Sequence, residues 1–386
     1  MSDNTISNNE NQFYLTCFKP LAVWMRVLGI ELDPFDLPKR RIFCGRSFSV
    51  LMFSITLFSN LACMANSFNQ QLLFILPNSN VNGSASDFWT LVIDIGSSTV
   101  LAIGAHATLL AIPQNSEWRS LWTNLQQLAT ENGQPFYSKA RKTVLTSLLF
   151  IIADGCNNTI QAIFSDIKFD DRPMITRLAG FVSSLTQIYG VSGLVLFATI
   201  GWLTSEGFVQ HRYQVIALDP AIRPNPSVTT SDLKKLRRDF LTLSEIVLHI
   251  GNCFGPLVFV WIVYIFISVI ANSFYLVNSV HIRVELMLEV PFWISLLIRN
   301  LIFLFVLASI PVTLQRESLN TWKSLRRISF DDPLLQCQLD TLTMEVLQSP
   351  TEMTAMDLFQ VNLTLFPTLV GTTLTYLIIL SQFQSK

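Results

Sequence analysis

The stretch "TYLIILSQF", residues 375–383, closes the last apolar run of the chain. Thr375 and Tyr376 stand at one end of an almost aliphatic core, and Gln382 and Phe383 stand at the other. A helix that only crosses lipid needs apolar residues and gains nothing from a polar pair at one end and a glutamine at the other. The polar ends of this run therefore indicate a function beyond anchoring.

The rest of the chain is also strongly apolar. Half of its 386 residues are hydrophobic and 14% are charged, whereas about a quarter of the residues of a soluble domain are charged. Seven runs are long enough for a helix of about 20 residues to cross a bilayer. We predict an all-α, polytopic membrane protein with one seven-helix domain over residues 1–386 and with spans near 48–76, 88–112, 143–165, 179–205, 246–272, 290–314 and 361–383.

Basic residues predict the orientation of these segments. Twenty of them precede the first segment or lie in the connections after the second, fourth and sixth segments, whereas five lie on the opposite side. Because connections rich in lysine and arginine stay in the cytoplasm, we expect a cytoplasmic N-terminus and an extracellular C-terminus. This orientation is the reverse of that of a G-protein-coupled receptor.

The long inner connections carry helical patterns of their own. Thr229 and Asp232 have the spacing of a capping box, and apolar residues follow them at helical intervals, at Leu233, Leu236, Phe240 and Leu243. We expect cytoplasmic helical extensions over about 205–245 and 315–360. Their apolar stripes need a partner, which is either the same chain or a neighbouring subunit.

Signatures of catalysis and of metal binding are missing from the sequence. There is no Gly-rich phosphate loop, no zincin helix and no nucleophile elbow. The four histidines are scattered over different segments, and no cysteine pair has the spacing of metal ligands. We therefore predict no enzyme, no cofactor, no metal site and no nucleic-acid partner, and we interpret His106 and His249 as residues at helix interfaces.

Three ionisable residues lie inside the expected segments, where a charge is costly unless it faces protein or water. Arg299, Asp154 and Asp94 all fall in the outer half of the membrane by residue count. At about 1.5 Å per residue, a long arginine side chain reaches the depth of either acid. We expect Arg299 to pair with Asp154 or Asp94, either as an ion pair that only fixes helix orientation or as part of a ligand contact.

One sequence motif is placed for glycosylation. Asn82-Gly83-Ser84 lies in the expected outer connection between the first and second segments. Glycans are attached to such sequons on exposed loops. Asn82 is therefore the glycosylation candidate, whereas the matches at Asn157 and Asn362 lie in or beside expected spans.

The last segment differs from the others by a polar stripe. Threonines recur every three or four residues and apolar or amide residues continue roughly the same face, at Thr364, Thr368, Thr372, Thr375, Ile379, Gln382 and Phe383. Threonines commonly support close helix packing in membranes. The alternative is that this face lines a conduit in which apolar residues form a constriction that dewets.

The same segment resembles a known family. "TYLIILSQF" fits, at every position, the terminal TYhhhhhQF signature of the arthropod gustatory receptors, in which h is hydrophobic except for Ser381 here. "SPTEMTAMDLFQVNLTLF", residues 349–366, is similar to the stretch that leads into the last segment of the family. The likeness in motifs covers the last 50 or so residues, and elsewhere it extends to topology and segment lengths.

The resemblance implies an architecture. Such receptors have seven helices with the N-terminus inside, and they assemble as tetramers around one central pore that the last helix lines. The cytoplasmic helices hold the tetramer together. A small-molecule tastant enters a pocket that opens outwards among segments 2 to 6, and the pore then conducts cations. The implied partners are the tastant, permeant cations, membrane lipid and further family members.

The resemblance also implies residue roles. Gln382 and Phe383 match the signature positions at the outer mouth of the pore, where we expect the gate. Thr375 and Tyr376 match the inner anchor of the signature. The candidate wall residues lie between these positions or further along the same stripe, at Ile379, Leu380, Thr372 and Thr368.

We therefore expect a gustatory receptor in the plasma membrane that acts as a ligand-gated, non-selective cation channel, as a homo- or heterotetramer. Sugar receptors of the family commonly have a glutamate directly after the tyrosine, and Leu377 at that position argues against a sugar receptor. The alternatives are a receptor of the G-protein-coupled type, which the charge distribution disfavours, and a non-conducting receptor-like membrane partner.

Overall fold

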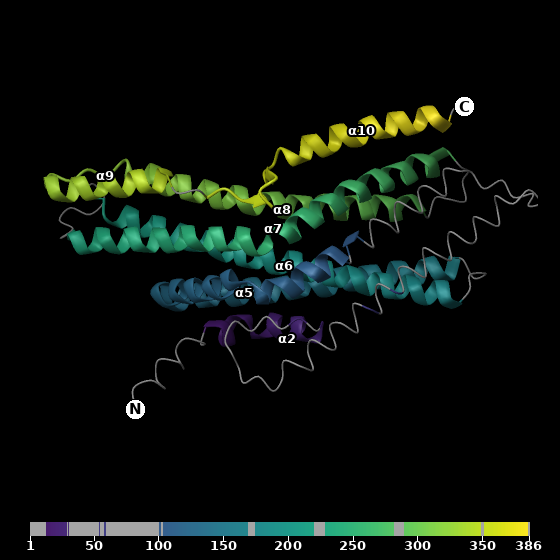
Figure 1. Cartoon of the computed structure of the whole chain (residues 1–386), viewed down its shortest axis with the longest axis horizontal. Coiled ribbons are helices and arrows are strands. Elements are labelled where there is room, and N and C mark those ends of the chain that lie inside the picture. The colour runs from purple at the N-terminus through teal and green to yellow at the C-terminus, as the bar shows by residue number, and fades with distance from the viewer. Residues whose placement is uncertain are drawn as a thin grey trace, which may run out of the picture.

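The computed structural model describes residues 13–28, 30, 54, 58, 100, 101, 103–168, 174–219, 228–281, 289–348 and 351–384. Over these residues the chain forms an elongated bundle of helices that run roughly along one axis (Figure 1). In chain order the elements are η1 (Tyr14–Phe18), α2 (Lys19–Val27), η2 (Ile112–Gln114), α5 (Ser116–Lys168), α6 (Met174–Ala217), α7 (Thr230–His281), α8 (Glu289–Leu325), α9 (Pro333–Gln348), β1 (Thr354–Ala355), β2 (Phe359–Gln360) and α10 (Leu365–Gln384).

The fold class is the predicted one, because the described chain is almost entirely helical and its apolar helices are long. Helices α5 to α8 are each long and apolar enough to cross a membrane, and α10 is a shorter apolar helix. The expected segment over 48–76, apart from residues 54 and 58, and about half of the one over 88–112 lie outside the described residues.

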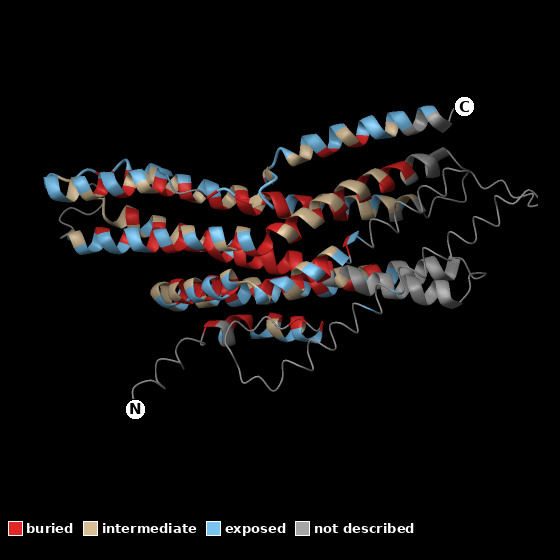
Figure 2. Ribbon diagram, in the orientation of Figure 1, coloured by how far each residue is buried: buried red, intermediate tan, exposed pale blue. Residues whose placement is uncertain are grey.

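Helix α6 lies at the centre of the bundle. It contacts α5, α7 and α8, and 89% of its most apolar stretch is buried (Figure 2). Glycines allow these close contacts: a Cβ atom at Gly201 would lie 2.3 Å from Cγ2 of Ile310 on α8. Small residues at such positions let helix backbones approach in a membrane.

Helix α5 contains the chain reversal between the expected second and third segments, and the sequence patterns did not predict that it is a single turn inside an otherwise helical stretch. Gly133 has a φ of 64°, in the left-handed region that glycine adopts readily, and Pro135 follows it. Residues 116–132 run antiparallel to α7, as the pairs Glu117–His249 and Asn124–Glu245 show. Residues 136–168 run antiparallel to α6, as Lys139–Glu206 and Ser147–Thr199 show. Helix α6 in turn runs antiparallel to α7, as Gly190–Trp261 and His211–Leu236 show. The two parts of α5 therefore form a helical hairpin.

Helices α7 and α9 begin at side-chain caps. Thr229 and Asp232 cap α7 reciprocally, because each backbone N–H donates to the other side chain, at 2.9 Å and 3.3 Å. Before α9, Asp332 Oδ1 accepts a hydrogen bond of 2.9 Å from the N–H of Leu334. Helix α9 then packs against α7 and α8 through Leu339, Leu342 and Val346.

A β-hairpin, and not a helix, ends the extension that we expected over 315–360. Strands β1 and β2 pair antiparallel, and Met356 and Asp357 at their turn have φ values of 54° and 57°. Left-handed backbone is uncommon for residues other than glycine, and no pattern in the sequence predicted a turn of this kind at Met356 and Asp357. The hairpin lies on α7 at Gly255, where an added Cβ atom would stand 3.4 Å from the backbone nitrogen of Met356.

Candidate pore helix and intramembrane ion pair

Helix α10 leaves the bundle after the hairpin and is exposed along most of its length (Figure 2). Among its described side chains, Leu369 and Thr373 are buried. Helix α10 contacts α7, and Phe366 in its first turn packs on Phe305 of α8 with ring centres 6.3 Å apart. Leu374 and Ile378 are 55% and 58% exposed. An apolar helix with so little contact to its own chain must be covered by lipid or by further protein.

Thr368, Thr372 and Thr375 of α10 lie on one exposed or partly exposed face, and the proton of each hydroxyl is already used in a hydrogen bond. Thr368 Oγ1 donates to the carbonyl of Thr364 at 2.9 Å, and Thr372 Oγ1 donates to that of Thr368 at 2.8 Å. Thr375 Oγ1 makes the same kind of bond to Gly371 at 2.9 Å. Because each hydroxyl donates within the helix, its oxygen lone pairs remain for a partner outside it. This face therefore offers acceptors, which suit water and cations.

The remaining candidate pore residues follow towards the C-terminus. Tyr376 is 47% exposed and Ile379 is 40% exposed, and Gln382 is also exposed. The side chains of Leu380 and Phe383 lie outside the part of the chain that the structure describes. The stripe thus continues past the threonines to an aliphatic residue and then to an amide.

Arg299 of α8 and Asp154 of α5 meet in a two-pronged ion pair. Arg299 Nε donates to Asp154 Oδ1 at 2.7 Å, and Nη2 donates to Oδ2 at 3.0 Å. Asn158 Nδ2 adds a third hydrogen bond to this carboxylate, at 3.0 Å. The two side chains are 9% and 8% exposed, and the guanidinium lies 5.0 Å from the ring centre of Phe303. Both charges are thereby compensated at a buried place. Asp94, the alternative partner, lies outside the described residues.

A groove of about 230 Å³ opens at this ion pair, between α5 and α8. Apart from Arg299 and Asp154, its lining is apolar or small: Phe150, Ala153, Ser295, Ile298, Ile302 and Phe303. A mostly apolar cleft with a few oriented polar groups is the usual form of a small-molecule site.

A buried amide cluster lies next to Arg299, and the sequence analysis missed it. Asn300 of α8 donates from Nδ2 to Ser268 Oγ of α7 at 2.8 Å, and Asn272 donates to the same oxygen at 3.2 Å. All three side chains are at most 5% exposed. Sequence could have drawn attention to two asparagines inside apolar segments, but not to their convergence on one serine.

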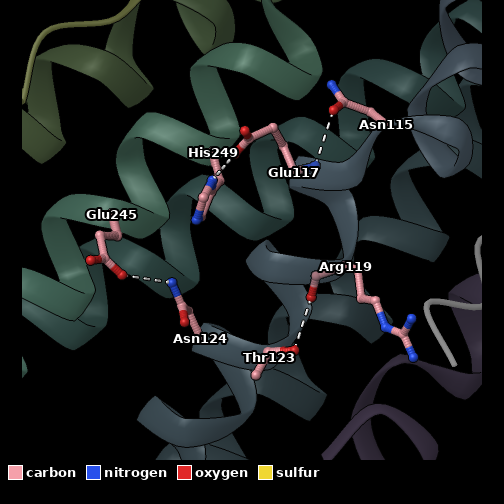
Figure 3. Close-up of polar contacts among 7 residues, drawn as sticks. All are labelled: Asn115, Glu117, Arg119, Thr123, Asn124, Glu245 and His249. Carbon is pink, nitrogen blue, oxygen red and sulfur yellow. Dashed lines mark hydrogen bonds and ion pairs between the residues drawn. The ribbon is translucent and has the colours of Figure 1, made fainter.

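Polar contacts also join α5 and α7 near the inner ends of the expected segments (Figure 3). Glu117 contacts Nδ1 of His249, and Asn124 Nδ2 donates to Glu245 at 3.3 Å. Asn115 accepts a bond of 3.0 Å from the N–H of Glu117 and so caps the start of α5. His249 therefore lies at a helix interface. Asn82, the glycosylation candidate, lies outside the described residues.

Comparison with known proteins identifies the family. The family model described as "7tm Chemosensory receptor" matches residues 13–386. This chain belongs to the seven-transmembrane chemosensory receptors. Nothing matches this chain among curated protein sequences. The family consists of receptors and not of enzymes, so the prediction that the chain is not an enzyme is confirmed.

Solved structures support the fold of this chemosensory receptor. The insect olfactory receptor OR5 from Machilis hrabei in complex with eugenol superposes with a TM-score of 0.68 at 13% identity, over 95% of this chain and 97% of that chain. A second structure of OR5 from Machilis hrabei, whose description mentions no ligand, superposes with a TM-score of 0.65 at the same identity and the same coverage. At this level of identity the likeness concerns the fold.

Proposed function

We propose that this chemosensory receptor is a gustatory receptor that forms a ligand-gated, non-selective cation channel in the plasma membrane. Four subunits surround one pore, α10 of each subunit lines it, and the N-terminus is cytoplasmic. The observation that carries the proposal is the exposed, acceptor-bearing threonine face of α10, followed by the TYLIILSQF signature. A channel needs such a face, because partly hydrated cations pass along oxygen acceptors.

The gate in this proposal lies at the outer end of α10. Gln382 and Phe383 stand at the mouth, and Ile379, with Leu380, narrows the conduit below it by an apolar ring. The ring closes the pore when water leaves it, and the ligand opens the pore by binding the open state more tightly. Tyr376 and Thr375 anchor the inner end of this constriction.

The ligand in this proposal is a small organic molecule. The structurally similar OR5 receptor is solved with eugenol, which supports a ligand of that size class. The groove beside Arg299 and Asp154 has an apolar lining suited to such a molecule. We assign the ion pair itself to the orientation of α5 and α8, because its hydrogen bonds are already made within the protein.

Cysteine accessibility in α10 tests the proposal. Each substituted chain is expressed at the cell surface, currents are evoked with a panel of sugars, bitter compounds, amino acids and eugenol, and a water-soluble thiol reagent is applied. We expect the reagent to change the current at pore-face positions, namely Thr368→Cys, Thr375→Cys and Ile379→Cys. It should leave the current unchanged at matched positions on the other sides of the helix, namely Val370→Cys, Leu374→Cys and Leu377→Cys. The unsubstituted chain controls for its own cysteines.

Two outcomes would contradict the channel. Equal modification on all sides of α10 would remove the pore assignment. Absence of current from a receptor that reaches the surface, alone and together with other family members, would favour a non-conducting partner. Antibody access to an N-terminal tag on intact cells would overturn the proposed orientation.

A further inference from the structure

The connection between α8 and α9 contains a pair of arginines that a serine follows closely. Residues 326–330 read RRISF. The chain has two further pairs of adjacent arginines, and the second residue after each of those pairs is a phenylalanine, namely Phe43 and Phe240. After the third pair the same position is Ser329, so only this pair is followed by a hydroxyl at that spacing.

Ser329 lies on the surface of the protein. Residues 328–330, between α8 and α9, are neither helix nor strand. Ser329 is exposed, and its hydroxyl makes no hydrogen bond with another described residue. On one side of it Ile328 is buried, and on the other side the N–H of Phe330 donates to Gln336 Oε1 at 2.9 Å. The serine therefore projects from a short loop that is held at both sides.

Both arginines of this loop are exposed and have hydrogen-bond donors for a partner. The guanidinium of Arg326 lies 4.9 Å from the ring centre of Trp322, and this stacking uses its flat face but not the N–H groups at its edge. Neither Arg326 nor Arg327 makes an ion pair with another described residue. The helix dipole favours cations after a helix end in any case, so it is the exposed serine that distinguishes this pair.

Two arginines, one further residue, a serine and an apolar residue form the pattern that basophilic serine/threonine kinases recognise. Carboxylates beside the kinase cleft pair with the arginines, and the segment around the serine must be free of helix to enter the cleft. The stretch 328–330 meets this requirement. Phe330 supplies the apolar residue; it is partly buried, and its release breaks the hydrogen bond to Gln336.

The position of this loop suits an enzyme that works in the cytoplasm. Helix α9 lies at one end of the bundle, and α10 extends towards the other end (Figure 1). In the orientation given under the proposed function the tip of α10 faces outwards, so the connection between α8 and α9 lies on the cytoplasmic side. The inference below rests on that orientation, but it requires neither a pore nor a tastant.

We propose that Ser329 is phosphorylated by a basophilic serine/threonine kinase of the cytoplasm. The γ-phosphorus of a nucleoside triphosphate forms a bond to Ser329 Oγ while its bond to the β–γ bridging oxygen breaks. The nucleoside diphosphate leaves with that oxygen, and the hydroxyl proton passes to a carboxylate of the kinase.

Phosphorylation changes the charge at the start of α9. Between α8 and α9 the two arginines balance Asp331 and Asp332, and a phosphate adds a charge of about −1.5 to −2. Asp332 caps α9 by accepting a hydrogen bond of 2.9 Å from the N–H of Leu334. The modified chain therefore carries a strong negative charge three residues before the cap of α9.

Phosphorylation of the purified full-length protein in detergent tests the proposal independently of channel activity. The probe is the catalytic subunit of cyclic-AMP-dependent protein kinase with ATP, and tandem mass spectrometry maps the modified positions. We expect phosphate at Ser329, its loss in Ser329→Ala and its retention in Ser329→Thr. Arg326→Gln/Arg327→Gln should lower kcat/KM about a hundredfold, at about tenfold for each charge-assisted contact that is lost.

Matched variants separate this site from a general effect of charge or of serine content. Arg316→Gln/Lys234→Gln removes the same charge from exposed positions and should leave kcat/KM within about twofold. Ser231→Ala removes an exposed serine that no arginine pair precedes and should leave the modification unchanged. An equal loss in the charge control, or modification of Ser329 only after thermal unfolding, would overturn the proposal.

Intact cells test the cytoplasmic placement. Activation of the kinase in cells that express the receptor should phosphorylate Ser329. Modification of the purified protein without modification in cells would overturn the placement and with it the proposal. A receptor that is phosphorylated at Ser329 but conducts no current would support the proposal and contradict the proposed channel function alone.

Discussion

Helices α6 and α10 are both apolar, yet they meet opposite surroundings. Over its most apolar stretch α6 is 89% buried within its own chain, whereas on α10 residues as apolar as Leu374 are more than half exposed. Both helices carry threonines that donate to the carbonyl four residues earlier, as Thr199 and Thr372 do. Local structure is therefore alike in the two helices, and only packing separates them.

This difference teaches where each helix finds its stability. Helix α6 is held by glycine contacts, a hydrogen bond between hydroxyls and neighbours on three sides, so substitutions there should act on folding. Helix α10 has few such contacts within the described chain, so substitutions there should act on assembly or conduction. Four experiments test this separation, and they are given in order of expected effect.

The largest loss of stability is expected from breaking the buried ion pair between Arg299 and Asp154. Arg299→Met leaves Asp154 buried without its cation, and breaking a buried ion pair in this way costs about 3–5 kcal/mol. The double variant Arg299→Met/Asp154→Leu should recover most of the loss, because no uncompensated charge remains. Thermal unfolding of the purified protein measures both, with the exposed Ile298→Met as control. Equal loss in the single and double variants would show that the pair does not act as a unit.

Glycine substitutions compare the two helices directly. Gly201→Ala in α6 places a Cβ atom 2.3 Å from Cγ2 of Ile310, next to the α8 backbone, and should cost about 1–3 kcal/mol. Gly371→Ala in α10 meets nothing within 4 Å and should stabilise the helix by about 0.5–1 kcal/mol. The fraction of monodisperse protein after heating reports both changes. A destabilising Gly371→Ala would mean that a neighbouring subunit packs on that position.

Threonine-to-valine changes separate stability from conduction. Thr199 on α6 is buried and lies 2.7 Å from Ser147 Oγ, so Thr199→Val should cost about 1–2 kcal/mol in thermal unfolding. Thr372→Val on α10 removes an acceptor from the exposed face and should change stability by less than about 0.5 kcal/mol. The same variant should lower single-channel conductance. Unchanged conductance with lost stability would place Thr372 in a packed interface.

The smallest effect is a pH dependence of stability, which arises from titratable groups on α6 and α7 and has no counterpart on α10. Burial, with repulsion from Glu131, raises the pKa of Asp239 to about 6, so stability contributed by this group rises as pH falls from 7 to 5. Burial lowers the pKa of His211 to about 4, so its contribution falls over the same range. Asp239→Asn should therefore make acidification more destabilising, and His211→Gln less, each by about 1 kcal/mol.

Melting temperatures of the two variants and of the unsubstituted protein at pH 7 and pH 5.5 test these signs. Helix α10 carries no acidic, lysine, arginine or histidine residue, so Thr372→Val should keep the pH response of the unsubstituted protein. Shifts of the same sign in Asp239→Asn and His211→Gln would contradict the argument.

Much of the bundle could be predicted because its signals are local. Apolar run length predicts the long helices, and the spacing of Thr229 and Asp232 predicts the cap at which α7 begins. Counting residues from the expected segment ends brings Arg299 and Asp154 to similar depths, and the structure places them in contact. In each case the feature depends on residues whose spacing a regular helix fixes.

Other features depend on contacts that spacing does not fix. The reversal at Gly133 follows from one left-handed glycine inside a stretch that is helical on both sides. The β-hairpin needs Met356 and Asp357 in a conformation that neither residue favours, and it exists beside a glycine of α7 that is distant in sequence. The cluster of Ser268, Asn272 and Asn300 requires the register of two helices. Tertiary packing decides all three.

Because the β-hairpin packs on Gly255 of α7, α10 is held at its start and extends away from the bundle at its other end. The hairpin and the buried Leu369 and Thr373 hold the first half of the helix against the bundle, and Gln382 lies nine residues beyond Thr373. At about 1.5 Å per residue this free part is about 14 Å long, so a tilt of about 10° about Thr373 moves its tip about 2.4 Å, close to the width of a water molecule. A modest rearrangement where α7 meets the hairpin is thereby magnified at the far end of the helix.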